Sequence, residues 1–183
     1  MKTFQHSYKL CTVILTIEYV ILMKLTAFKY LALCAALLTI SMVSAANENS
    51  CWVKAGEKHG IDPWLLYGIA KVESSLDTAA MNLDHKRRTG SYDIGLMQIN
   101  SRNLSGLARY GIDEAALKDP CVSIDVGAYI LAEKIRTHGN TWDAVGAYNA
   151  ACTQLKGNDC LRARRIYAWK VYRAIQKAQK EAA

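Results

Sequence analysis

The sequence lacks several features that mark repetitive or strand-rich proteins. It contains no internal repeat, no low-complexity linker and, beyond its first 45 residues, no convincing long strand. Proline occurs only twice, as Pro63 and Pro120, and each follows an aspartate at the start of an apolar, helix-like stretch. These observations predict one compact, mainly α-helical domain with at most a small hairpin.

The sequence also lacks the C-x-x-C spacing of common zinc sites, and no histidine lies close to its later cysteines. No metal is therefore expected. Four cysteines lie beyond residue 45, an even number that suits disulfides in an exported chain. Three pairings are possible, and we favour Cys51–Cys121 with Cys152–Cys160, the second closing a short loop.

No apolar run reaches the roughly 20 residues that span a bilayer comfortably. Met23–Ala45 instead has lysines, an apolar core and a small-residue end, which predicts a signal peptide cleaved after Ala45. Met1–Leu22 adds a second apolar run ahead of a complete signal peptide, so we expect translation to begin at Met23. The alternative is a long uncleaved anchor. The leader is thus expected over residues 1–45 and the domain over 46–183, exported to the periplasm.

Acidic residues are fewer than basic ones, and the chain carries a formal charge of +7. Without residues 1–45, 19 basic and 15 acidic residues remain, a charge of +4. This surplus is too weak to indicate nucleic acid, and a monomer is expected. The bases crowd the last predicted helix, where a solvated face is a simpler interpretation than a binding patch. They are Arg162, Arg164, Arg165, Lys170, Arg173, Lys177 and Lys180.

The stretch Asp62–Asp77 predicts a helix that carries a buried carboxyl group. Asp62 can cap its start, and apolar residues recur behind it at helical spacing up to Leu76. Glu73 falls on the same face. A carboxyl group in apolar surroundings has a raised pKa and can act as a general acid near neutral pH. The alternative is that Glu73 lies at the end of this apolar face and its side chain reaches solvent.

The remaining patterns predict further helices and one exposed loop. Residues 79–92 are polar and turn-rich, which favours a loop or small hairpin. In the last helix Ile166, Trp169, Val171, Tyr172 and Ile175 are the apolar positions. The other helices are expected at about Ser50–His59, Ser101–Tyr110, Cys121–His138, Thr141–Asn149 and Leu161–Gln179.

Three short motifs follow one another along the chain: VESSL around Glu73, GLMQIN at Gly95–Asn100 and GAYNA at Gly146–Ala150. In this order and spacing they resemble the lytic transglycosylases with a lysozyme-like fold. The resemblance covers nearly all of Cys51–Tyr172. An early Cys-Trp pair and the DPC segment at Asp119–Cys121 are most similar to members that serve secretion systems, conjugation machines and type IV pili.

The resemblance implies a role for particular residues. It makes Glu73 the catalytic acid and base, and assigns substrate contacts to residues of all three motifs: Ser74, Met97, Gln98, Tyr148 and Asn149. Met97 would help form the floor of the sugar groove. The family usually continues Tyr-Asn-Ala-Gly, whereas Ala151 stands here in place of glycine. Because glycine permits a left-handed turn, we expect a strained or shifted loop at Ala151.

The implied reaction cleaves the MurNAc–GlcNAc bond of peptidoglycan without water and leaves a 1,6-anhydro end, with no cofactor. The implied partners are glycan strands and a secretion, conjugation or pilus apparatus. A hydrolytic muramidase of the same fold is one alternative, with Asp84 or Asp93 holding a water. A non-catalytic peptidoglycan-binding assembly protein is another, although an intact Glu73 argues against it.

Overall fold

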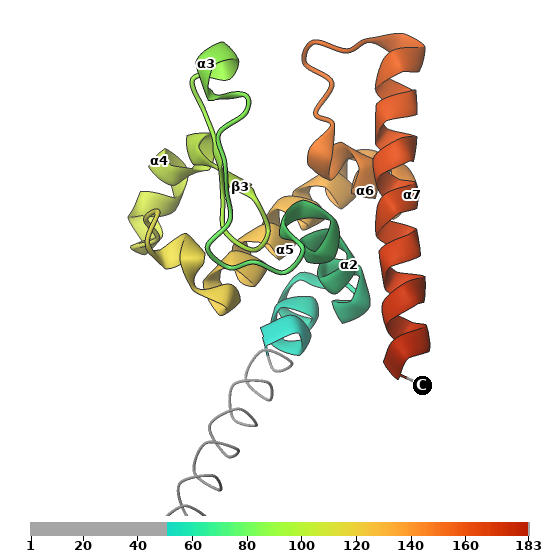
Figure 1. Ribbon diagram of the computed structural model, residues 1–183, viewed down its shortest axis with the longest axis horizontal. Coiled ribbons are helices and arrows are strands. Elements are labelled where there is room, and N and C mark those ends of the chain that lie inside the picture. The colour runs from blue at the N-terminus through green and yellow to red at the C-terminus, as the bar shows by residue number, and fades with distance from the viewer. Residues whose placement is uncertain (1–50, 183) are drawn as a thin grey trace, which may run out of the picture. The chain divides into compact units, whose positions relative to one another are not determined.

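The computed structural model describes residues 51–182 (Figure 1), so the expectations for the leader, Met23 and Ala45 lie outside the described residues. Within this range no helix is long and apolar enough to cross a membrane. The fold is mainly helical, as predicted. Its longer helices, after helical residues 51–59, are α2 (Pro63–Ser74), α5 (Pro120–His138), α6 (Trp142–Asn149) and α7 (Gly157–Ala182).

A small sheet takes the place of the expected loop or hairpin. It has three antiparallel strands in the order β1–β2–β3, namely β1 (Met81–Asn82), β2 (Asp93–Ile94) and β3 (Ile99–Asn100). One turn of helix, α3 (Lys86–Thr89), lies in the connection between β1 and β2. Two-residue strands are too short to give an alternating apolar pattern, so the sequence did not reveal them.

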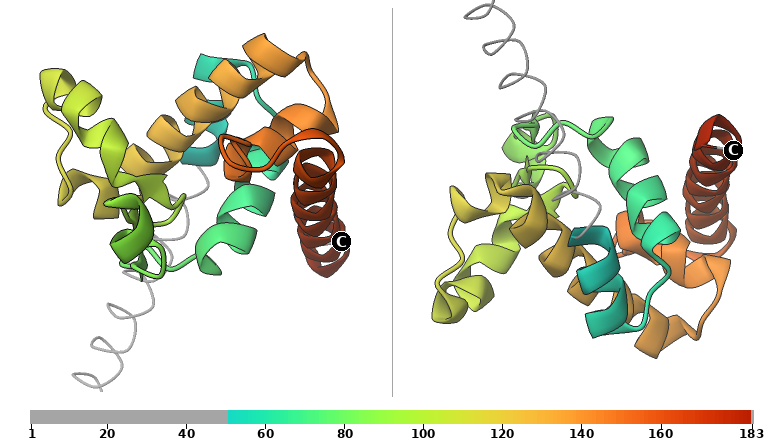
Figure 2. Two further views of the ribbon diagram at one scale, coloured as in Figure 1. Left: turned by 90° about the horizontal axis from the view of Figure 1, so that it is seen from above. Right: turned by 90° about the horizontal axis from the view of Figure 1, so that it is seen from below.

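Short helical turns link the sheet to α5. They are η1 (Ser101–Asn103), α4 (Leu104–Leu107), η2 (Ala108–Tyr110) and η3 (Ala116–Lys118). The first three cover the helix expected at 101–110. In Figures 1 and 2, α5 runs between this part, with the sheet and α3, and the part that holds α2, α6 and α7.

The predicted starts of α2, α5 and α6 are correct, while the end of α2 and both ends of α7 differ. Asp62 caps α2, Asp119 caps α5 and Thr141 caps α6, each through its side-chain oxygen. However, α2 ends at Ser74 rather than Asp77, because the next two residues have left-handed φ angles of 58° and 71°. α7 extends beyond the predicted helix at both ends.

The hydrophobic core joins the elements that carry the three motifs. It includes fully buried side chains from α2, α5, α7, β3 and the turn before β3, namely Leu66, Ile69, Ile124, Leu131, Val171, Ile99 and Met97. α7 packs against both α2 and α6. Residues more than 90 positions apart are thereby brought together at the carboxyl end of α2.

Both favoured disulfides are present. Cys51–Cys121 joins the first described helix to the start of α5, and Cys152–Cys160 ties the loop after α6 to α7. The left-handed residue in that loop is Cys152, with φ of 58°, and not Ala151. Of the expected strained or shifted loop, the strain at Ala151 is absent, and the left-handed turn is shifted to the next residue.

The first glycine of GAYNA has a packing role. A Cβ added to Gly146 would lie 2.5 Å from Cβ of Arg164 and 2.6 Å from its carbonyl oxygen. Such distances leave no room for a methyl group unless α7 moves. Gly146 therefore allows α7 to lie directly on α6, next to the remaining residues of the motif.

We predict that Gly146→Ala destabilises the protein by about 1–3 kcal/mol, because the added methyl group meets backbone atoms of α7. Gly106→Ala is the matched control, since a Cβ there would have no neighbour within 4 Å. Urea unfolding of both variants measures the difference. Equal stabilities would contradict the close contact between α6 and α7.

Candidate active site

Glu73 lies in the last turn of α2, largely enclosed by the protein. Burial raises the pKa of its carboxyl group from an ordinary 4.5 to about 7, opposed by a hydrogen bond from Tyr167. The negative charge of Asp93 raises this pKa further, and Lys170 lowers it. A carboxyl group with this pKa holds its proton in a large share of molecules at neutral pH, as a general acid requires.

Tyr167 of α7 is the site residue that sequence reasoning missed. Its hydroxyl donates to Oε1 of Glu73 at 2.5 Å, across 94 positions of sequence. The side chain is only 5% exposed, and burial, with the neighbouring Glu73 carboxylate, raises its pKa far above the ordinary value. Tyr167 therefore remains a hydrogen-bond donor over the whole physiological pH range.

The apolar face predicted for the last helix was partly wrong. Ile166, Trp169 and Tyr172 are exposed, while Val171 is fully buried. The buried positions of α7 are Arg164, Tyr167, Ala168 and Val171. Their spacing of three and four residues follows one helix face and was the signal that could have placed Tyr167 inward.

Met97 reaches the site through its backbone rather than its side chain. The side chain has no exposed surface and packs on Gly127, where an added Cβ would lie 2.6 Å from Cε of Met97. Its carbonyl oxygen accepts a hydrogen bond from the Tyr148 hydroxyl at 3.0 Å, and its N–H donates to the Ser123 hydroxyl at 3.1 Å. The backbone of Met97 thus holds the Tyr148 hydroxyl in position, while its side chain fills the core.

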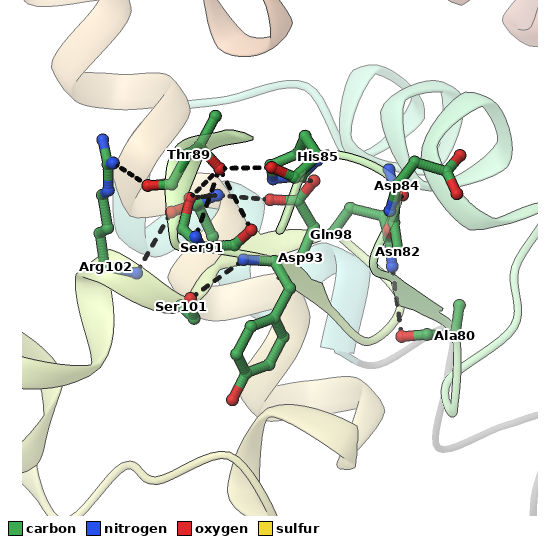
Figure 3. Close-up of polar contacts among 12 residues, drawn as sticks. Ala80, Asn82, Asp84, His85, Thr89, Ser91, Asp93, Gln98, Ser101 and Arg102 are labelled. Atoms are coloured by element: carbon green, nitrogen blue, oxygen red, sulfur yellow. Dashed lines mark hydrogen bonds and ion pairs between the residues drawn. The ribbon is translucent and has the colours of Figure 1, made fainter. Parts of the chain in front are cut away.

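Gln98 stands at a tight turn between β2 and β3, with a left-handed φ of 49°. Its amide nitrogen donates to the carbonyl oxygen of Gly95 at 2.9 Å and to that of Ala80 at 3.3 Å, the second contact being drawn in Figure 3. Among residues 51–182 no donor reaches its side-chain oxygen. This oxygen is therefore available to accept a hydrogen bond.

Ser74 fixes the end of α2 to the segment before Met97. Its hydroxyl oxygen lies 2.8 Å from the carbonyl oxygen of Leu96 and 3.3 Å from that of Ala70, and both can accept its proton. Because Ser74 directly follows Glu73, this contact holds the carboxyl group against the sheet segment.

The third motif divides between the interior and the surface. Tyr148 is partly buried, and burial together with the negative charge of Glu73 raises its pKa well above the ordinary value. Asn149, the last residue of α6, is exposed. Arg164 holds the following turn, since its Nε donates to the carbonyl oxygen of Ala150 at 3.1 Å.

Arg164 corrects the interpretation of the basic helix as an entirely solvated face. It is only 9% exposed, and its guanidinium donates to Asp143 at 2.8 Å. Arg164 therefore belongs to the interface between α6 and α7. The exposed bases of the helix include Arg162, Arg165, Lys170 and Arg173.

Asp93 is the carboxylate of the second motif region that acts on Glu73 electrostatically. Its Oδ1 accepts from the Asn100 amide at 2.7 Å, and its Oδ2 lies 3.6 Å from Nε2 of His85. Figure 3 shows Asp93 beside His85 and the hydroxyl residues of this region, whereas Asp84 points away. Asp84 is exposed. Within residues 51–182 no cluster of three histidine, cysteine or acidic residues could hold a metal.

The geometry thus joins a largely enclosed carboxyl group, two tyrosines and a short sheet between helices. Residues 50–162 of the sequence match the family described as "Transglycosylase SLT domain". This chain belongs to that transglycosylase family. Membership makes it a peptidoglycan lytic transglycosylase, as the three motifs indicated.

Relatives of this transglycosylase occur among bacterial proteins of similar length. "Invasion protein IagB" of Salmonella typhi is 40% identical over 132 residues, which cover 72% of this chain and 80% of the relative. "Protein IpgF" of Shigella flexneri is 39% identical over 124 residues, covering 67% and 77%. An Escherichia coli "X polypeptide" is 40% identical over 144 residues, covering 78% and 80%.

A solved structure with the same fold is that of an inactive mutant of the lytic transglycosylase Slt from Pseudomonas aeruginosa. It is 21% identical, with a TM-score of 0.53 over 71% of this chain. The matched region is 24% of that much longer protein. The similarity shows that the transglycosylase has the lysozyme-like fold.

The raised pKa of Glu73 predicts a stability that depends on pH. The folded state binds the proton more tightly than the unfolded state, so this contribution is complete below pH 4.5 and is lost as the pH rises to about 7. Glu73→Gln should therefore stabilise the protein at pH 8 by up to about 3 kcal/mol more than at pH 4. Urea unfolding at both pH values measures this, with the exposed Glu57→Gln as control. A pH-independent effect would contradict the burial of an ionisable group.

A second prediction concerns the hydrogen bond from Tyr167, which favours the ionised form of Glu73. Tyr167→Phe removes the donor, so the pKa of Glu73 rises and the alkaline limb of the activity profile moves to higher pH, by about one pH unit. Rates of peptidoglycan cleavage against pH measure the shift, and the exposed Tyr129→Phe serves as control. An unmoved limb would show that Tyr167 does not contact the working carboxyl group.

Proposed function

We propose that this transglycosylase cleaves the β-1,4 bond between MurNAc and GlcNAc without water and leaves 1,6-anhydroMurNAc ends. The observation that carries the proposal is the state of Glu73, a largely enclosed carboxyl group with a pKa of about 7. Such a group can donate a proton to the leaving oxygen and then accept one in the same cycle.

The chain's own residues support this sequence of steps. Protonated Glu73 gives its proton to the glycosidic oxygen as the bond to the anomeric carbon breaks. The 6-hydroxyl of the same sugar then attacks that carbon, and ionised Glu73 removes its proton. The Tyr167 hydroxyl holds Oε1 in place, so the other carboxyl oxygen, Oε2, is the one that faces the substrate.

The motif residues take supporting roles in this proposal. Gln98 offers its side-chain oxygen, and Asn149 its exposed amide, as hydrogen-bonding groups for the sugar. Tyr148, Ser74 and Met97 fix the position of these groups through hydrogen bonds of hydroxyls to backbone carbonyls. Their contribution is positioning rather than proton transfer.

A hydrolytic muramidase is the second candidate, and Asp93 is the observation that favours it. Its charge reaches Glu73, and a second carboxylate is what a hydrolytic glycosidase uses. However, Asn100 occupies one of its oxygens, and His85 lies near the other. A carboxylate held in this way is less free to activate a water, which favours the non-hydrolytic reaction.

We further propose that the enzyme acts in the periplasm and opens peptidoglycan locally for a secretion, conjugation or pilus apparatus. The signal peptide predicted at Met23–Ala45 supports export. Relatives of nearly the same length that are named invasion proteins support a specialised rather than a general role. The two disulfides suit an oxidising compartment.

Mass analysis of the fragments released from purified peptidoglycan tests the proposed reaction. The native enzyme should release products one water lighter than those of hydrolysis, and Glu73→Gln should reduce release by at least about a thousandfold. Asp93→Asn should retain the anhydro products. Reducing-end products that disappear in Asp93→Asn would establish a muramidase instead.

A further inference from the structure

A groove lies on the outer side of α7, away from Glu73. Its volume is about 740 Å³, within the range of roughly 300–1,000 Å³ that is usual for small-ligand sites. Three aromatic rings, partly exposed, form a continuous cluster in it. Trp169 stacks on Tyr172 with ring centres 5.2 Å apart, and Trp142 meets Tyr172 edge to face at 5.7 Å.

The groove is separate from the candidate active site. None of the residues assigned to catalysis or to the three motifs lines it. Each helical residue turns by about 100°, so Arg165 and Trp169, two positions to either side of Tyr167, point to the opposite side of α7. Tyr167 faces Glu73, whereas Trp169 is 57% exposed.

The charged residues that line the groove are all basic. Arg162 and Arg165 line it together with Asn158, and none of the acidic side chains of residues 51–182 does. Arg162 has a distant, exposed partner in Asp159 at 3.8 Å, which holds it only weakly. Guanidinium groups beside exposed aromatic rings are suited to a carboxylate-bearing ligand.

The kinds of side chain in the groove favour a sugar over a protein helix. Grooves that bind amphipathic helices present apolar anchors, whereas only Ile166 and Ala168 are aliphatic here, and Ala168 is 5% exposed. Aromatic rings flanked by amide and guanidinium donors match a pyranose instead. Its C–H face packs on the electron-rich ring, and its hydroxyls reach the polar groups.

We propose that the groove on the outer side of α7 binds a second stretch of peptidoglycan, with sugar rings on Trp169 and Trp142 and stem-peptide carboxylates on Arg162 and Arg165. The proposal rests on the proposed function, because it takes the enzyme's own polymer as the ligand. Two sites on one polymer raise the effective concentration of glycan at Glu73. The enzyme therefore stays on the wall between cleavage events.

Sedimentation with purified peptidoglycan sacculi tests the groove without any need for activity. In the Glu73→Gln background, Trp169→Ala and Arg165→Gln should each weaken binding by roughly tenfold. Tyr110→Ala and Lys180→Gln are matched controls, an exposed ring and an exposed base outside the groove, and should bind as before. A soluble disaccharide tetrapeptide should compete better than a neutral chitin oligosaccharide of equal length.

Activity measurements separate this proposal from the proposed reaction. With Glu73 intact, Trp169→Ala should cleave a short soluble glycan at the native rate but release fragments from sacculi more slowly. Unchanged sacculus binding in both groove variants would overturn the second site, even if anhydro products form. If sacculus binding is unchanged but the groove variants no longer bind a protein of the apparatus, the groove docks a protein instead. Equal competition by the neutral chitin oligosaccharide would overturn the role of the arginines.

Discussion

The hydrogen bond between Tyr167 and Glu73 is the contact on which this structure depends. It can form only because α7 lies close to α2, and that approach requires a small residue. A Cβ added to Gly68 of α2 would lie 2.5 Å from Cγ1 of Ile175. The packing of α7 on α2 therefore has two effects. It encloses the Glu73 carboxyl group and raises its pKa, and it places the Tyr167 hydroxyl where it can donate to that group.

Much of the fold could be predicted because helix starts carry local signals. Asp62 caps α2 as expected, and α5 and α6 begin where predicted, with Asp119 and Thr141 as their caps, since capping depends on the residue and its immediate neighbours. Helix ends and the sheet were harder to predict from the sequence. The end of α2 depends on left-handed residues that are not glycine, and the two-residue strands are held by pairing partners distant in sequence.

The candidate site shows the same division between local and distant determinants. Glu73 could be identified because it falls on the apolar face of one helix and within the first of the three motifs. Tyr167 was missed because its partner lies in another helix. Exposed apolar residues such as Ile166 and Trp169 stand close to it in sequence and obscured the spacing of the buried face. Motif residues were recognised, but the structure shows that Ser74 and Met97 act through backbone contacts that the sequence alone does not specify.

The central claim is that burial keeps Glu73 protonated near neutral pH, and an NMR titration tests it most directly. Protein labelled with ¹³C at glutamate side-chain carboxyls gives one resonance per residue, and Glu73→Gln identifies that of Glu73. We expect this resonance to titrate with a pKa of about 7, clearly above the other glutamates. A midpoint near the ordinary value of 4.5 would contradict the account, since Glu73 would then be ionised before it could act as an acid.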